Sequence, residues 1–260
     1  MADFTAKDVQ ELRKSTGAGM MDAKKALVET DGDFEAATQL LREKGLAKAM
    51  TRTDRDNSEG AVAIAQDASG AALVQLKSET DFSAKSDAFQ ALVQDMANAV
   101  LANGPEAIAE LTERLESLKL TVKENIEVGT VAHFAATEGK ILDAYLHGGG
   151  RAGVLIEAEG IDPELLHEIA LNVAFAKPRY LSRDEVPAEA VEKERQALLE
   201  ITKSEGKPEA AWDKIVEGRI DSWFADSVLL EQGMFGEKEK VSSRIGSGTI
   251  SRFAFVMIGS

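Results

Sequence analysis

The chain has 260 residues, 44% of them hydrophobic, which is enough to bury one large core or two to three smaller ones. Its 45 acidic and 30 basic residues give a net charge of −15, which opposes nonspecific attraction to nucleic-acid phosphates and suits a basic protein surface, although many soluble proteins are acidic without such a partner. It contains no cysteine, which excludes disulfides, thiolate nucleophiles and thiolate metal sites.

The N-terminal stretch MADFTAKDVQELRK shows no targeting signal, because no apolar segment follows a basic start. No later run approaches the roughly 18 consecutive apolar residues that a membrane-spanning helix needs. We therefore expect a soluble, cytoplasmic protein that binds no membrane and makes no direct contact with nucleic acid.

Residues 1–47 predict a module of three short helices. Thr5 is placed to cap the first helix, the glycines of STGAG end it, and the second helix runs from about Met21 to Glu29. The third runs from Phe34 to about Lys44, where we expect Gly45 to end it. Its apolar residues recur at helical spacing and predict one buried face: Phe34, Ala37, Leu40 and Leu41. The polar residues 48–60 predict a linker.

Residues 61–139 predict a first α+β subdomain. Two alternating runs, Ala61–Gln66 and Ala71–Ser78, flank the turn DASG and predict a β-hairpin. A helix with one apolar face is expected from about Lys85 to Ala102. Helical pattern continues from Ala107 to Leu118, and the run NIEVGTVAHFAAT predicts a strand, which the turn EGK separates from the next one.

Residues 140–186 and 226–260 predict a second α+β subdomain, so the predicted fold class is α+β. Its strands are ILDAYLH, GVLIEAEG and the run Ile250–Ile258, and its helix runs from Pro163 to Lys177. Between them, residues 187–225 predict a helical hairpin that bends at SEGKP. Its apolar stripe is expected to pack the hairpin on itself, with a partner contact or homodimerisation as the alternative: Val191, Leu198, Leu199 and Ile201.

The motif most suggestive of chemistry is GGGRAG, because Gly148, Gly150 and Gly153 satisfy the dinucleotide-binding pattern G-x-G-x-x-G after a strand that ends at His147. That pattern requires a helix next, whose N-terminal amides hold the pyrophosphate. The residues that follow, VLIEAEG, predict a strand instead. We therefore favour a hairpin turn over a cofactor site.

No other pattern indicates catalysis. The three histidines, His133, His147 and His167, fall on separate predicted elements without metal-ligand spacing. A nucleophile elbow and a phosphate loop are both absent from the sequence. We expect no metal, no cofactor and no covalent chemistry.

The stretch SETDFSAKSD leaves two alternatives for Asp81 and Phe82. Phe82 lies seven residues before Phe89, so in one continuous helix both rings would share a buried face, with Asp81 as the helix cap. Against this, neither Ser83 nor Ser86 has Glu or Gln three residues later, so no capping box marks a helix start. An exposed Phe82 would instead be an anchor for a protein partner.

Four stretches, in order along the chain, resemble the bacterial translation elongation factor Ts family: ELRKSTGAGMMDAKKAL, ETDFSAKSDAFQ, AYLHGGGRAGVL and KIVEGRIDSWFADSVLLEQ. The resemblance covers most of the chain to Gln232 and is looser beyond it. Ser83 stands where the family often has valine. The resemblance implies an N-terminal three-helix module of the ubiquitin-associated type, a core of two α+β subdomains with antiparallel sheets, and a protruding helical hairpin.

The resemblance also implies a function: guanine-nucleotide exchange on elongation factor Tu, bound in its GDP-bound and nucleotide-free forms during translation elongation. It implies that a Thr-Asp-Phe turn enters the nucleotide domain of the partner and dislocates Mg²⁺. The matching residues here are Thr80, Asp81 and Phe82, with Ser83 adjoining. Further partner contacts are implied at Met20, Met21, His147 and Gly148.

Overall fold

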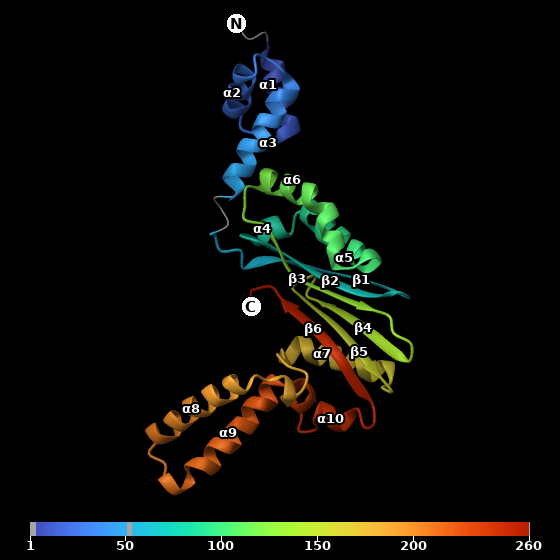
Figure 1. Ribbon diagram of the computed structural model, residues 1–260, viewed down its shortest axis with the longest axis vertical. Coiled ribbons are helices and arrows are strands. Elements are labelled where there is room, and N and C mark those ends of the chain that lie inside the picture. Colours follow the sequence, from blue (N-terminus) through green and yellow to red (C-terminus); the bar gives the residue numbers. More distant parts are fainter. Residues whose placement is uncertain (1–3, 51–53, 260) are drawn as a thin grey trace. The chain divides into compact units, whose positions relative to one another are not determined.

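The computed structural model describes residues 4–50 and 54–259 (Figure 1), and the chain divides into two compact units. The first unit comprises residues 1–65, 72–133 and 257–260, and the second comprises residues 66–71 and 134–256. The first is built on the sheet β1-β2-β3 and the second on β4-β5-β6, each with its own helices. This confirms the predicted α+β class.

Three helices open the first unit: α1 (Ala6–Thr16), α2 (Met20–Glu29) and α3 (Phe34–Met50). Thr5 caps α1 in a capping box with Asp8, and Gly17 ends α1 in the left-handed conformation, both as the sequence favours. The buried residues of the three helices form one small core: Val9, Leu12, Ala23, Ala26, Leu27 and Ala37.

Two predictions for the third helix were wrong. The helix does not end at Gly45 but continues to Met50, because Gly45 keeps a negative φ and the residues after it, LAKAM, are mostly good helix formers. Phe34 is 38% exposed rather than buried, since it occupies the first position of α3. Part of the predicted linker, residues 51–53, lies outside the described residues.

The first sheet contains β1 (Glu59–Asp67), β2 (Gly70–Ser78) and β3 (Glu127–Ala135), in that order. The predicted β1–β2 hairpin is confirmed. Three helical segments lie on the same side of this sheet in Figure 1: α5 (Asp87–Asn103), η1 (Pro105–Leu111) and α6 (Thr112–Val122). The core between sheet and helices includes Phe89, which is fully buried. Between β2 and α5 lies the one-turn helix α4 (Asp81–Ala84).

The second sheet contains β4 (Lys140–His147), β5 (Ala152–Glu159) and β6 (Thr249–Met257), in that order. β4 and β5 pair antiparallel with His147 opposite Ala152, so GGGR forms the hairpin turn that the strand prediction favoured. Gly148, Gly149 and Gly150 all have positive φ, which glycine adopts without strain. The strands on either side of EGK belong to different sheets, so that turn joins no hairpin.

The helix α7 (Pro163–Ala176) packs on β4 and β5, and the C-terminal tail completes this unit. The tail contains η4 (Leu229–Glu231), η5 (Met234–Gly236) and α10 (Val241–Arg244) before β6. Its fully buried side chains include Leu229, Met234 and Val241. Within the tail, the Nε2 atom of the buried Gln232 donates to the carbonyl oxygen of Asp226 at 2.9 Å.

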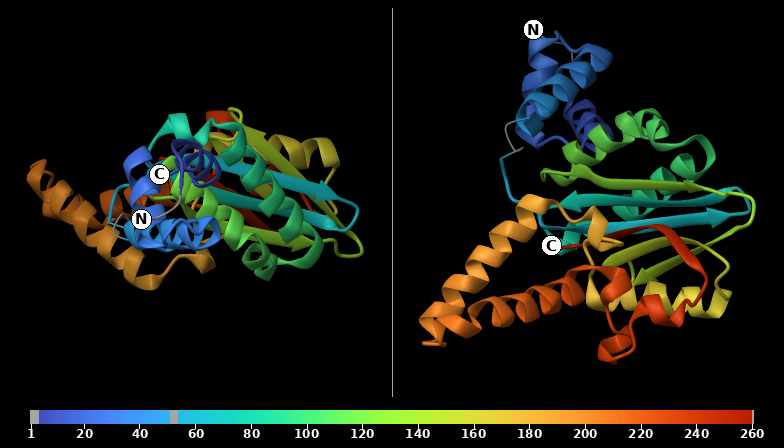
Figure 2. Two further views of the ribbon diagram at one scale, coloured as in Figure 1. Left: turned by 90° about the horizontal axis from the view of Figure 1, so that it is seen from above. Right: turned by 60° about the horizontal axis from the view of Figure 1, so that its bottom comes forward.

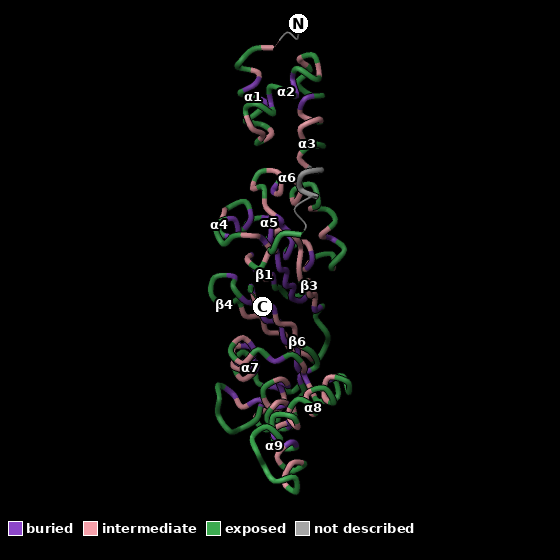
Figure 3. Tube along the Cα trace, turned by 90° about the vertical axis from the view of Figure 1, so that its left-hand side faces the viewer, coloured by how far each residue is buried: buried purple, intermediate pink, exposed green. Residues whose placement is uncertain are grey.

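A helical hairpin, predicted from its two charged helices, extends from the second unit (Figure 2). It consists of α8 (Ala188–Ser204) and α9 (Trp212–Ser227), with η2 (Arg183–Glu185) before it and η3 (Glu209–Ala211) at the bend. Most of its residues are exposed or half-buried (Figure 3). Val191, Leu198 and Leu199 pack within it as expected, but Ile201 is 47% exposed, so its inclusion in the packed stripe was wrong.

One carboxylate on β5 is buried among ion pairs. Glu157 is 2% exposed and accepts from Arg252 at 2.9 Å and from Lys140 at 3.2 Å. Burial alone would raise the pKa of Glu157, but hydrogen bonds and charge from Arg252 and Lys140 outweigh burial and lower it. Because Lys140, Glu157 and Arg252 lie on β4, β5 and β6, these ion pairs link the three strands of the second sheet.

Within the described parts of the chain, no helix is long and apolar enough to cross a membrane. Those same residues contain no group of three or more histidine, aspartate and glutamate side chains that could hold a metal ion.

Candidate partner-binding turn

The segment Ser78–Ser86 forms a compact reversal between β2 and α5. Thr80 has extended backbone geometry and caps α4, with its hydroxyl oxygen accepting from the Ser83 amide at 3.2 Å. α4 ends after one turn, and Ser86 is again extended as the N-cap of α5. Phe82 and Phe89 therefore lie on different helices, and their seven-residue spacing does not place them on one face.

Phe82 projects into solvent from this turn. It is 83% exposed, more than the other exposed large hydrophobic side chains of the described residues, such as Phe175 at 64%. Its neighbours Ser83 and Ala84 are 4% exposed, so the turn is anchored on one side and presents the ring on the other. The alternative in which Phe82 begins a buried helix face was wrong. The exposure of Phe82 is confirmed, and its role as an anchor for a protein partner stays a prediction.

Asp81 lies beside Phe82 in the first turn of α4. Its Oδ2 atom accepts from Lys85 Nζ at 2.6 Å, and this hydrogen bond, with the positive charge of Lys85, lowers the pKa of Asp81. Asp81 is therefore ionised near neutral pH. Both side chains are more than half exposed, so this ion pair contributes little stability.

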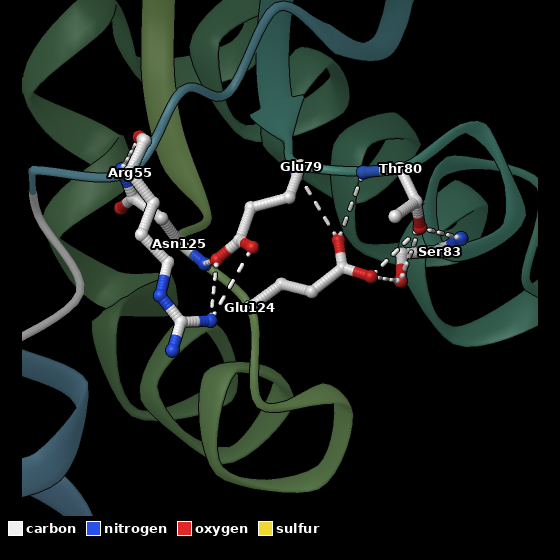
Figure 4. A network of polar contacts seen from close by, with 6 residues as sticks. All are labelled: Arg55, Glu79, Thr80, Ser83, Glu124 and Asn125. Atoms are coloured by element: carbon white, nitrogen blue, oxygen red, sulfur yellow. Dashed lines mark hydrogen bonds and ion pairs between the residues drawn. The ribbon is translucent and has the colours of Figure 1, made fainter.

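A residue that sequence analysis missed holds the turn in place. Glu124, which lies between α6 and β3, directs both carboxylate oxygens at the turn (Figure 4). Its Oε2 atom accepts from the amides of Glu79 and Thr80, each at 3.1 Å. Its Oε1 atom accepts from the hydroxyl of Thr80 at 2.7 Å and from that of Ser83 at 2.5 Å. No short-range pattern identifies such a residue, because it lies about 40 positions from its partners.

A second carboxylate completes the network in the opposite direction. Glu79 Oε1 accepts from the amide of Asn125 at 2.6 Å and pairs with Arg55 at 3.3 Å. The side chain of Asn125 donates to the carbonyl oxygen of Arg55 at 3.0 Å. Each of the two loops thus uses a carboxylate to bind backbone amides of the other, as Figure 4 shows.

The remaining candidates lie in other elements. Met20 and Met21 are 43% and 63% exposed at the start of α2. His147 and Gly148 are exposed at the β4–β5 turn of the second unit, where Tyr145 Oη lies 2.8 Å from His147 Nδ1. The structure thus brings Thr80, Asp81, Phe82 and Ser83 into one turn and places the other four candidates elsewhere.

Comparison with known proteins gives this turn its context. The family model described as Elongation factor TS matches residues 79–259, so the match begins at the turn and includes the C-terminal tail. The chain belongs to the elongation factor Ts family. Elongation factor Ts of Mycobacterium avium (strain 104) is 40% identical over 281 aligned residues, covering 100% of this chain and 99% of the relative. Elongation factor Ts of Clavibacter sepedonicus is 39% identical over 278 aligned residues and is covered completely.

Membership of the elongation factor Ts family confirms the resemblance found in the sequence and makes the chain a translation elongation factor. The looser likeness beyond Gln232 does not mark a boundary, because the elongation factor Ts match runs to residue 259. This agrees with the buried side chains and the edge strand that the tail contributes to the second unit.

Proposed function

We propose that this chain is a guanine-nucleotide exchange factor that binds GDP-bound elongation factor Tu in the cytoplasm and promotes GDP release. Family membership supports the partner, and the exposed Phe82 on its anchored turn is the observation that carries the proposal. The factor performs no covalent chemistry. It promotes GDP release through contacts with elongation factor Tu that form best when the nucleotide is absent.

Exchange of this kind is a coupling between two binding equilibria. A factor that weakens GDP binding by a given ratio is itself bound more weakly by the same ratio when GDP is present. Burying a phenylalanine ring contributes about 1.5–3 kcal/mol. Since about 1.4 kcal/mol corresponds to tenfold in affinity, a pocket that admits Phe82 only without nucleotide would supply about one to two decades of coupling.

The neighbouring residues have separate roles in this proposal. Phe82 wedges into the nucleotide domain, while the ionised Asp81 disturbs groups that hold Mg²⁺ and so loosens the phosphates. Thr80 and Ser83 hold the turn. Met20 and Met21 add a contact from the N-terminal module, and the β4–β5 turn at His147 and Gly148 adds another from the second unit.

The decisive experiment measures release of a fluorescent GDP analogue from elongation factor Tu. We expect catalytic amounts of the factor to accelerate release severalfold or more, and we expect the factor alone to bind no nucleotide. Nucleotide binding by the factor alone would favour a phosphate site at the glycine turn after His147. Binding to elongation factor Tu without any change in release would indicate a passive scaffold.

The Mg²⁺ part of the mechanism makes a separate prediction. Asp81→Asn removes the charge but keeps the size of the side chain, so it should reduce accelerated GDP release about tenfold in millimolar Mg²⁺. In excess EDTA the same variant should match the wild type, because no ion remains to be displaced.

The matched control for Asp81→Asn is Asp87→Asn, a nearby exposed acid at the start of α5. It should match the wild type under both conditions. If Asp81→Asn reduced accelerated GDP release equally with and without Mg²⁺, Asp81 would not act through the ion.

A further inference from the structure

Helix α4 is too short to hold its own shape. It has four residues, and a single helical turn fixes several dihedral angles for very few hydrogen bonds, so isolated turns of this length do not persist in water. Its backbone hydrogen bonds run from Ala84 to Thr80 at 3.2 Å and from Lys85 to Asp81 at 3.0 Å. Phe82 adds little packing, because its side chain is 83% exposed. The conformation must be imposed by the surroundings.

Glu124 itself is placed from both sides. Before it, Lys123 ends α6 in the left-handed conformation, with its amide donating to Lys119 at 2.9 Å. After it, Asn125 and Ile126 are 5% and 0% exposed, which fixes the chain where it enters β3. The backbone of Glu124 therefore lies between a capped helix end and two buried residues.

The donors around Glu124 match what a carboxylate can accept. An ionised carboxylate only accepts hydrogen bonds, and the turn supplies four donors to it. These are the amides of Glu79 and Thr80 and the hydroxyls of Thr80 and Ser83. Because the Thr80 hydroxyl gives its proton to Glu124, its lone pairs remain free to cap α4 through the Ser83 amide. The same contacts therefore orient the cap and fix the turn.

From this geometry we infer that Glu124 is a positioning residue for nucleotide exchange, holding α4 in the conformation that presents Phe82 and Asp81 to the partner. The inference rests on the proposed function. In this inference Glu124 acts through the turn and does not itself contact the partner. A turn already in its binding conformation loses less conformational freedom on binding, so its affinity is higher.

The test compares Glu124→Ala and Glu124→Gln with the wild type in the GDP-release assay. If Glu124→Ala leaves the turn in its competent conformation about one tenth of the time, the factor concentration at half-maximal release rises about tenfold, while the maximal rate stays within about twofold. Glu124→Gln keeps one acceptor oxygen and should fall between the two. Glu110→Ala, an exposed acid on η1, is the control and should match the wild type.

A second readout does not involve the partner. Hydrogen exchange of peptides covering residues 79–85 should be faster in Glu124→Ala than in the wild type, with α5 peptides unchanged. If elongation factor Tu shows no accelerated GDP release even with the wild type, the proposed function fails, and this measurement still decides whether Glu124 holds the turn.

Ser83→Ala guards against a variant that fails to fold. It removes one of the hydrogen bonds to Glu124 and should raise the half-maximal concentration about threefold. Combined with Glu124→Ala it should add no further defect, because the contact is already lost. If the two substitutions instead raised the half-maximal concentration independently, so that their effects multiplied in the double variant, the inference would be overturned. It would also be overturned if Glu124→Ala had both the half-maximal concentration and the hydrogen exchange of the wild type. Should Glu124→Ala not fold, Ser83→Ala and Glu124→Gln decide by the same two readouts.

Discussion

Replacing Phe82 by alanine should lower accelerated GDP release at limiting factor concentration by about tenfold to a hundredfold, the range that burial of one phenylalanine ring supplies. The unfolding free energy of the free factor should stay within about 0.5 kcal/mol of the wild-type value, because the ring is 83% exposed. Loss of exchange without loss of stability is the signature of an anchor that acts only in the complex.

The matched control for Phe82→Ala is Phe175→Ala. Phe175 is also a largely exposed ring, at 64%, and lies on α7 in the second unit. It should leave exchange unchanged, which separates the effect of the Thr-Asp-Phe turn from a general loss of surface hydrophobicity. If Phe82→Ala accelerated GDP release as well as the wild type does, the ring would have no part in the mechanism. If the Phe82→Ala variant melted at a much lower temperature than the wild type, the ring would pack against the rest of the free factor.

Periodic patterns predicted the elements of this chain better than they predicted its turn. Apolar spacing located α5, because this helix buries one face. The apolar runs on either side of DASG located the β1–β2 hairpin, whose second strand is buried on both faces. The same reasoning misjudged Phe82, since helical spacing has meaning only within one continuous helix and Ser86 interrupts it. Thr80, a good N-cap residue three positions before Ser83, was the local signal that would have marked the break.

Glu124 shows a different limit. Its partners lie in another loop of the first unit, so its role follows from tertiary structure and not from any spacing along the chain. Family resemblance pointed to the turn but not to the carboxylate beneath it. Gly45 shows a third limit, because the common glycine C-cap has a positive φ, and Gly45 does not adopt one.

Phe89→Ala should produce the opposite outcome to Phe82→Ala. Phe89 is fully buried on α5, against the first sheet, and truncating a buried phenylalanine costs about 3–5 kcal/mol of unfolding free energy. A domain of ordinary stability has only about 5–15 kcal/mol in total. The first unit should therefore be strongly destabilised although the residue type and the substitution are the same as at position 82.

Urea unfolding followed by circular dichroism measures this destabilisation, and hydrogen exchange of peptides from β1, β2 and α5 locates it in the first unit. Tryptophan fluorescence follows the second unit, because Trp212 and Trp223 both lie on α9. Phe89→Leu is the control: it keeps an apolar side chain in the core and should destabilise less than alanine. If Phe89→Ala unfolded at the wild-type urea concentration, the ring would not be part of the core, and the assignment of opposite roles to these two phenylalanines would fail.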